Sequence, residues 1–121
     1  MRSVLPGDLT AAARALLPVP PKRRSSMARC LIREAAAADA YCREHRRAHR
    51  LWGNGTLMAA AHGHPMGNEM SFDDPDYIKC QIHVLNALLA HVQAEAQDTQ
   101  RITVGSSSRR FGAISSPQSS Q

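Results

Sequence analysis

The sequence predicts an all-α fold, a small helical bundle of two long and two short helices with a disordered C-terminal tail. Alanine is abundant, aromatic residues make up only 4% of the chain, and β-branched residues are few outside its C-terminal stretch. This composition favours helices over strands. A chain of 121 residues has room for one domain with a single modest core.

Four segments carry helical signals. The first helix is expected at about residues 8–17, because Gly7 or Asp8 can cap it and Pro18 and Pro20 stop it. Pro21 begins a long helix that runs to about residue 46. A two-turn helix is expected at residues 56–62, followed by a loop rich in glycine and proline.

The last helix is expected to start at a cap formed by Ser71 or Asp73. Its predicted buried face consists of Tyr77, Ile78, Val84, Leu85, Leu88, Leu89 and Val92. From residue 98 the chain is rich in serine, glutamine and arginine and has no periodic apolar pattern. We therefore predict one helical domain over residues 1–97 and a disordered tail over 98–121.

The net charge of +5 is unevenly distributed. Residues 1–52 have a net charge of +7, residues 53–97 of −4, and the tail of +2. Helical spacing places four arginines opposite the apolar stripe of the long helix, and three aspartates mark the start of the last helix. The predicted interaction face is therefore Arg29, Arg33, Arg43 and Arg47 together with Asp73, Asp74 and Asp76.

No segment has the length of uninterrupted apolar sequence that a membrane helix needs, and the N-terminal stretch is broken by Pro6, Asp8 and Arg14. Three cysteines are an odd number and do not suggest a disulfide framework. These observations predict a cytoplasmic protein that does not associate with membranes.

Two Cys-x2-His steps offer a tetrahedral zinc set of Cys42, His45, Cys80 and His83. The helical wheel separates these side chains, so free cysteines and exposed histidines are the favoured interpretation, and no metal or other cofactor is expected. The histidines at positions 45, 49, 62 and 64 are a weaker metal pattern, for which the same interpretation is favoured.

The stretch from Arg50 to Thr56, RLWGNGT, raises a choice between a turn and an anion site. Exposed N–H groups at a helix start bind anions. The candidate anion site consists of Arg46, Arg50, Gly53, Asn54, Gly55 and Thr56. A tight turn is the favoured alternative, with Trp52 expected to be mostly buried against Leu57 and the long helices.

Glu34 and Gln81 interrupt the apolar faces of the two long helices. A buried carboxylate needs a partner, and the candidates for Glu34 are Arg14, Tyr41 and the indole of Trp52. An internal hydrogen-bond network is favoured over a polar pocket.

The order "GDLTAAARALL", a basic helix, "LWGNGTLMAAA" and "DDPDY" opening a last helix resembles a group of small uncharacterised alphaproteobacterial proteins. The resemblance covers roughly residues 1–92 and excludes the serine-rich tail. It supports the domain limits and implies no activity.

The leading functional hypothesis is a non-enzymatic helical interaction module, an adaptor or regulator that binds another protein or itself. The alternative is a nucleic-acid-binding protein that contacts phosphates through its arginines, which the isoelectric point of about 9.7 allows. No recognition helix or aromatic platform supports that alternative. An enzyme is the third hypothesis, since no nucleophile and base pair is evident.

Overall fold

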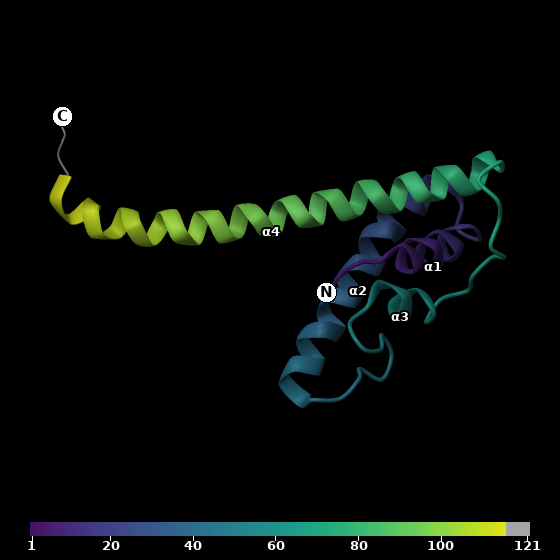
Figure 1. The fold of residues 1–121 in the computed structure, drawn as a ribbon, viewed down its shortest axis with the longest axis horizontal. Coiled ribbons are helices and arrows are strands. Elements are labelled where there is room, and N and C mark those ends of the chain that lie inside the picture. Colours follow the sequence, from purple (N-terminus) through teal and green to yellow (C-terminus); the bar gives the residue numbers. More distant parts are fainter. Residues whose placement is uncertain (116–121) are drawn as a thin grey trace. The chain divides into compact units, whose positions relative to one another are not determined.

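The computed structural model describes the backbone of residues 1–115 and the side chains of residues 1–100. Over this range the fold is all-α, as predicted, with two long and two short helices. The helices are α1 (Pro6–Leu16), α2 (Arg24–His45), α3 (Leu57–Ala61) and α4 (Pro75–Ser115), with a 3-10 turn, η1 (Pro21–Arg23), directly before α2 (Figure 1). No helix of the described residues is long and apolar enough to cross a membrane.

The chain divides into two compact units, of which the first extends from Met1 to Leu89 and the second begins at Ala90. Helix α4 contributes to both units. In the second unit His91 contacts Glu95 one turn later, at 3.3 Å. The tail predicted from residue 98 begins inside α4, and its residues 116–121 lie outside the described residues, so its predicted disorder stays a prediction.

Helix α1 begins at Pro6, slightly before the cap predicted at Gly7 or Asp8. Proline suits a first helical position because it lacks the N–H that would go unpaired there. Asp8 lies in the first turn, where its carboxylate accepts the N–H of Leu5 at 2.8 Å. The other oxygen accepts the N–H of Met58 in α3 at 2.9 Å. The buried Asp8 thus caps one helix and fixes the start of another.

Small side chains let the first three helices pack closely. Helix α1 contacts both α2 and α3, and α2 contacts α3. The alanines of the core are Ala11, Ala12, Ala13, Ala15, Ala28, Ala35, Ala60 and Ala61. Larger side chains fill the spaces between them, and the fully buried ones are Leu16, Leu31, Leu57, Tyr77, Cys80 and Val84. Dense packing of this kind makes the loss of single methyl groups costly.

Helix α4 starts at Pro75, where the Asp74 carboxylate accepts the N–H of Asp76 at 3.1 Å. This is the role that we predicted for Ser71 or Asp73. The core contains Tyr77, Cys80 and Val84 from this helix.

The predicted buried face of α4 is partly wrong. Four of its members are exposed, namely Ile78, Leu85, Leu89 and Val92. Because α4 is apolar on more than one side, helical periodicity alone did not reveal which side meets the core.

Candidate functional site

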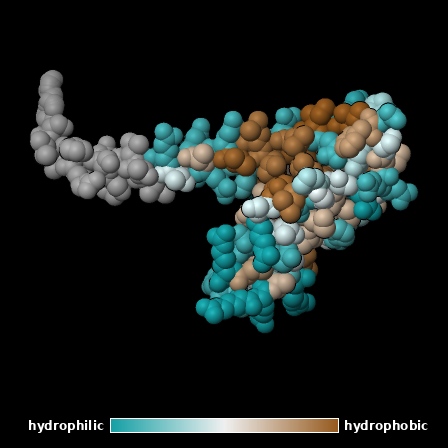
Figure 2. Space-filling view, viewed as in Figure 1, coloured by the Kyte–Doolittle hydropathy of each residue, from teal (hydrophilic) through white to brown (hydrophobic). Residues whose placement is uncertain are grey.

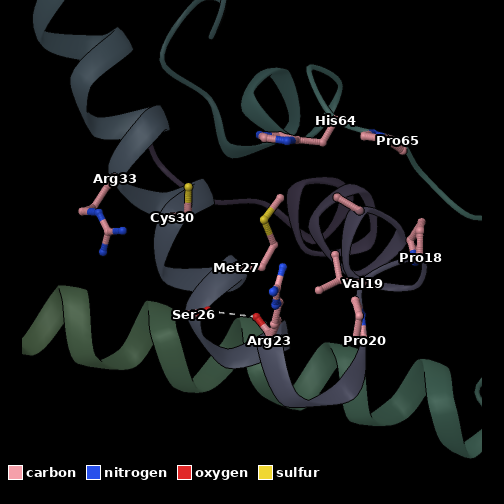
Figure 3. A pocket seen from close by; sticks show the side chains of 11 residues that line it. Pro18, Val19, Pro20, Arg23, Ser26, Met27, Cys30, Arg33, His64 and Pro65 are labelled. Atoms are coloured by element: carbon pink, nitrogen blue, oxygen red, sulfur yellow. Dashed lines mark hydrogen bonds between the residues drawn. The ribbon is translucent and has the colours of Figure 1, made fainter.

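A cavity of about 510 Å³ opens between the loop that follows α1, the first turns of α2 and the loop after α3. Its wall is largely apolar. Pro18, Val19 and Pro20 form one side, Met27 of α2 lies beside them, and Pro65 lies opposite (Figure 3). Proline fixes its own φ angle, so much of this wall is rigid before any ligand arrives.

Two arginines add positive charge to the cavity. Arg23, the last residue of η1, points toward its middle, and Arg33 lies at its edge beyond Cys30 (Figure 3). Both side chains are exposed. The hydroxyl of Ser26 donates to the Arg23 carbonyl at 3.1 Å, which fixes the backbone at the entrance. Arg33 was predicted as part of an interaction face, whereas Arg23 was noted only as one of the basic cluster Lys22, Arg23 and Arg24 that would contact nucleic acid.

A hydrogen-bonded group of three side chains closes the remaining side of the cavity. Glu34 contacts His64 Nε2 at 2.7 Å and accepts from the Cys30 thiol at 3.4 Å. His64 was not among the partners predicted for Glu34. Burial, and next the bond to Glu34, raise the pKa of the Cys30 thiol. Because the carboxylate separates the thiol from the imidazole, this group does not have the Cys–His contact of a cysteine nucleophile.

The four arginines of the predicted basic face do not form one continuous free surface. Helix α2 ends at His45, and Arg46 adopts a left-handed conformation with φ of 58°, so Arg47 lies beyond the helix. Arg43 pairs with the buried Asp39 at 2.8 Å. Arg29 donates to the Ser25 hydroxyl at 2.9 Å. All four arginines are exposed, but only three belong to α2.

The predicted acidic face is also largely engaged within the domain. Asp76 binds the buried Arg24 through both carboxylate oxygens, at 2.6 and 3.1 Å. This contact lowers the pKa of Asp76. Asp74 caps α4 and is partly buried, whereas Asp73 and Asp76 are both exposed.

Arg24 is a structural residue that sequence reasoning missed. Its side chain enters the domain and donates to the carbonyls of Leu16, Leu17 and Val19 at 3.0–3.1 Å. The carbonyls of Leu16 and Leu17 belong to the end of α1, where helices leave unpaired acceptors, and that of Val19 belongs to the loop that follows. In sequence Arg24 is one member of a basic cluster, with no signal that distinguishes it from Lys22 and Arg23.

The corner at residues 53–56 is built as a turn. The Asn54 side chain accepts from the N–H of Thr56, and the Thr56 hydroxyl accepts from the N–H of Ala59, both at 3.1 Å. The Asp8 carboxylate accepts the N–H of Met58. The N–H groups at the start of α3 that could bind an anion therefore already have acceptors. Gly53 and Gly55 have positive φ angles of 83° and 97°, which glycine adopts at little cost. This arrangement favours the turn over the anion site.

Trp52 is partly buried and lies outside the core cluster, so its expected contact with Leu57 stays a prediction. Its ring stacks on His49, with centroids 4.6 Å apart and planes 6° apart. His49 Nδ1 accepts the N–H groups of Leu51 and Trp52, which folds the chain back at this point. Tyr41 contacts the other side of this cluster.

The zinc candidates are not brought together as a metal site. Among the described residues no three His, Cys, Asp or Glu side chains form a group that could hold a metal ion. Cys42 instead contacts the Gly53 carbonyl at 3.7 Å, and Cys80 lies in the core. His45 packs against Tyr41. The fourth candidate, His83, is half-buried.

A second candidate surface lies on α4. Four exposed apolar side chains follow one another at spacings of four, three and four residues along the first unit, and we name them the α4 stripe: Ile78, Ile82, Leu85 and Leu89. Figure 2 shows a hydrophobic patch over this part of α4. Alternating steps of three and four are the heptad pattern of helices that pair side by side.

Comparison with curated proteins and with solved structures gave no match. One family pattern, described as a domain of unknown function, covers residues 2–88. This range coincides closely with the first compact unit and includes the cavity and every member of the α4 stripe except Leu89, the residue directly after it. The chain therefore belongs to the DUF7742 family, a domain of unknown function.

Proposed function

We propose that this protein is a non-enzymatic helical interaction module, and that the α4 stripe binds the α4 stripe of a second copy. The α4 stripe carries the proposal. Its side chains are between 36% and 55% exposed, although each is large and apolar. Monomeric proteins rarely leave such a continuous row uncovered.

Charge favours a second copy over an acidic or basic partner. The segment from Cys80 to Val92 contains no Lys, Arg, Asp or Glu. Such a surface offers no ion pair to a charged partner, and two copies face each other without repulsion. A second copy also presents a stripe of the same heptad spacing, which knobs-into-holes packing requires.

The size of the surface predicts a weak dimer. At about 1.5 Å per residue the α4 stripe is roughly 17 Å long. An interface of this length falls below the standard size of stable complexes, about 1,600 Å² in total. We therefore expect a dimer with a dissociation constant in the micromolar range, so whether the protein is monomeric or dimeric depends on its concentration.

Analytical ultracentrifugation across a concentration series tests the proposal. The wild-type protein should form a dimer, and Leu85→Glu should abolish it because a carboxylate would be buried in the new interface. Leu51→Glu is the matched control, since Leu51 is 68% exposed and lies outside α4. A wild-type protein that stays monomeric at millimolar concentration would overturn the proposal, as would equal dimers for the wild type and Leu85→Glu.

Nucleic-acid binding is the second candidate function. Arg43, Arg46, Arg47 and Arg50 are all exposed within one short segment. If they contact phosphates, binding to duplex DNA should weaken steeply with salt, and reversing Arg46 and Arg47 to Glu should remove it. Binding that is insensitive to both changes would contradict this candidate.

We also propose that the protein is cytoplasmic and that it belongs to an alphaproteobacterial group. All three cysteines are free thiols, which suits the reducing conditions of a bacterial cytoplasm. The narrower alphaproteobacterial grouping rests on the resemblance of the segments around residues 7–17 and 51–61.

A further inference from the structure

We propose that the cavity beside Met27 binds a small organic anion, with its apolar body on Met27 and Val19 and its carboxylate between Arg23 and Arg33. This site is separate from the α4 stripe, because no residue of α4 is among those that line it. The two proposals can therefore fail independently.

The charge of the cavity selects an anion. Arg24 and Arg43 have carboxylate partners, in Asp76 and Asp39. Among the described residues, neither Arg23 nor Arg33 takes part in an ion pair of this kind. No Asp or Glu is among the residues that line the cavity, and Glu34, which bonds to the lining residues Cys30 and His64, is already contacted by His64 at 2.7 Å. Two guanidinium groups thus remain to bind a ligand, and guanidinium recognises carboxylates well.

The apolar wall selects a ligand with a hydrocarbon part. Proline, valine, methionine and alanine account for six of the eleven lining residues. Inorganic anions gain nothing from such a wall, whereas an alkyl or aryl group would gain the free energy of leaving water. Met27 is flexible enough to adjust to different hydrocarbon shapes.

The volume and the rigidity of the cavity suit a small molecule. Its 510 Å³ lies within the range of about 300–1,000 Å³ that is usual for ligand sites. Three of the lining residues are prolines, Pro18, Pro20 and Pro65. A wall that is rigid before binding loses less conformational entropy when a ligand is bound.

The contact between Glu34 and His64 holds one side of the cavity in place. It joins α2 to the loop after α3, thirty residues apart in sequence. The same loop is held to α1 because the Arg14 carbonyl and side chain bond to Gly67. His64 is therefore a positioning residue here, which keeps Pro65 opposite the arginines.

Heteronuclear NMR titration of the full chain with three probes tests the proposal. Octanoate should shift the amide signals around Val19, Met27 and Cys30 in a saturable way. Octanol, which lacks the charge, and inorganic phosphate, which lacks the hydrocarbon, should each bind about tenfold more weakly or worse. Equal binding of octanoate and octanol would overturn the role of the arginines. Equal binding of octanoate and phosphate would overturn the role of the apolar wall.

Matched arginine variants locate the site. Arg33→Gln and Arg23→Gln should each weaken octanoate binding about tenfold. Arg29→Gln should leave it unchanged, since Arg29 is exposed one turn before Arg33 and does not line the cavity. Arg23 and Arg33 are both exposed, so the variants should still fold. An NMR spectrum otherwise unchanged would show this. Equal losses for Arg33→Gln and Arg29→Gln, or no saturable shift with the wild type, would refute the proposal.

Discussion

Arg24 binds Asp76 across a separation of fifty-two residues, with both carboxylate oxygens within 3.1 Å of its guanidinium nitrogens. Water barely reaches this guanidinium, because Arg24 is only 4% exposed. It also donates to carbonyls at the end of α1 and in the loop that follows. One side chain therefore terminates α1 and fixes the start of α4.

Replacing Arg24 should destabilise the first unit strongly. Arg24→Met keeps the aliphatic stem and leaves the carbonyls of Leu16, Leu17 and Val19 without this donor. Each unsatisfied buried group costs about 1–3 kcal/mol, so we expect a loss of about 3 kcal/mol or more in the free energy of unfolding. Urea denaturation followed by circular dichroism measures it. Arg23→Met, at the exposed neighbour, is the control and should change little; equal effects of the two variants would contradict this role.

The ion pair between Arg24 and Asp76 also predicts that the protein is less stable at low pH. The bond from Arg24 holds the pKa of Asp76 below its ordinary value of 3.8. The stabilising contribution is therefore fully present above pH 3.8 and is lost as pH falls through the lower folded value. Asp76→Asn should be less stable at neutral pH and should lose less stability on acidification. Thermal melts of both proteins between about pH 2 and 6 test this. If the melting temperature of the two proteins changed in parallel with pH, Asp76 would not contribute to the loss of stability in acid.

The cysteines should differ in reactivity toward a thiol reagent. Burial raises the pKa of Cys80, which lies fully inside the core, and only the thiolate reacts. Cys80 should therefore be labelled at the rate at which the domain unfolds, and mass spectrometry of digested samples would assign the labelled sites. Stability should fall as pH rises above 9.0, the ordinary thiol value, because unfolding frees the thiol to ionise. Rapid labelling of Cys80 in the native protein would contradict its place in the core.

Trp52 should contribute less to stability than a core tryptophan. Because the indole is half-buried and stacked on His49, we expect Trp52→Ala to cost about 1–2 kcal/mol, below the 3–5 kcal/mol typical of a fully buried ring. His49→Ala should shift the tryptophan emission to longer wavelength by exposing the ring. An unchanged spectrum would show that the stacking does not persist in solution.

The helices could be predicted because their signals are local. Pro18 and Pro20 end one helix, Thr56 caps another, and alanine-rich segments lie between such boundaries. The short helix expected at residues 56–62 is found as α3, and Thr56 caps it by accepting the N–H of Ala59. Element boundaries of this kind depend on neighbouring residues, which the sequence displays directly.

The candidate site was less predictable because it depends on contacts between distant segments. Glu34 interrupts an apolar face, which indicated that it needs a partner, but His64 lies thirty residues away in a loop without periodicity. The cavity itself arises from the meeting of two loops and a helix. Likewise, the spacing of Ile78, Ile82 and Leu85 is visible in the sequence, but their exposure depends on which face of α4 the other helices cover.

The close approach of Gly55 to α2 has a consequence for how this family can vary. A Cβ atom at Gly55 would lie 2.8 Å from the Asp39 backbone, closer than real contacts allow. A side chain at this position is therefore excluded unless α2 shifts. In an alignment of homologues we therefore expect Gly55 to be nearly invariant, because a replacement would require the backbone of α2 at Asp39 to move. Distant members could then be recognised by this corner even where the rest of their sequence has diverged.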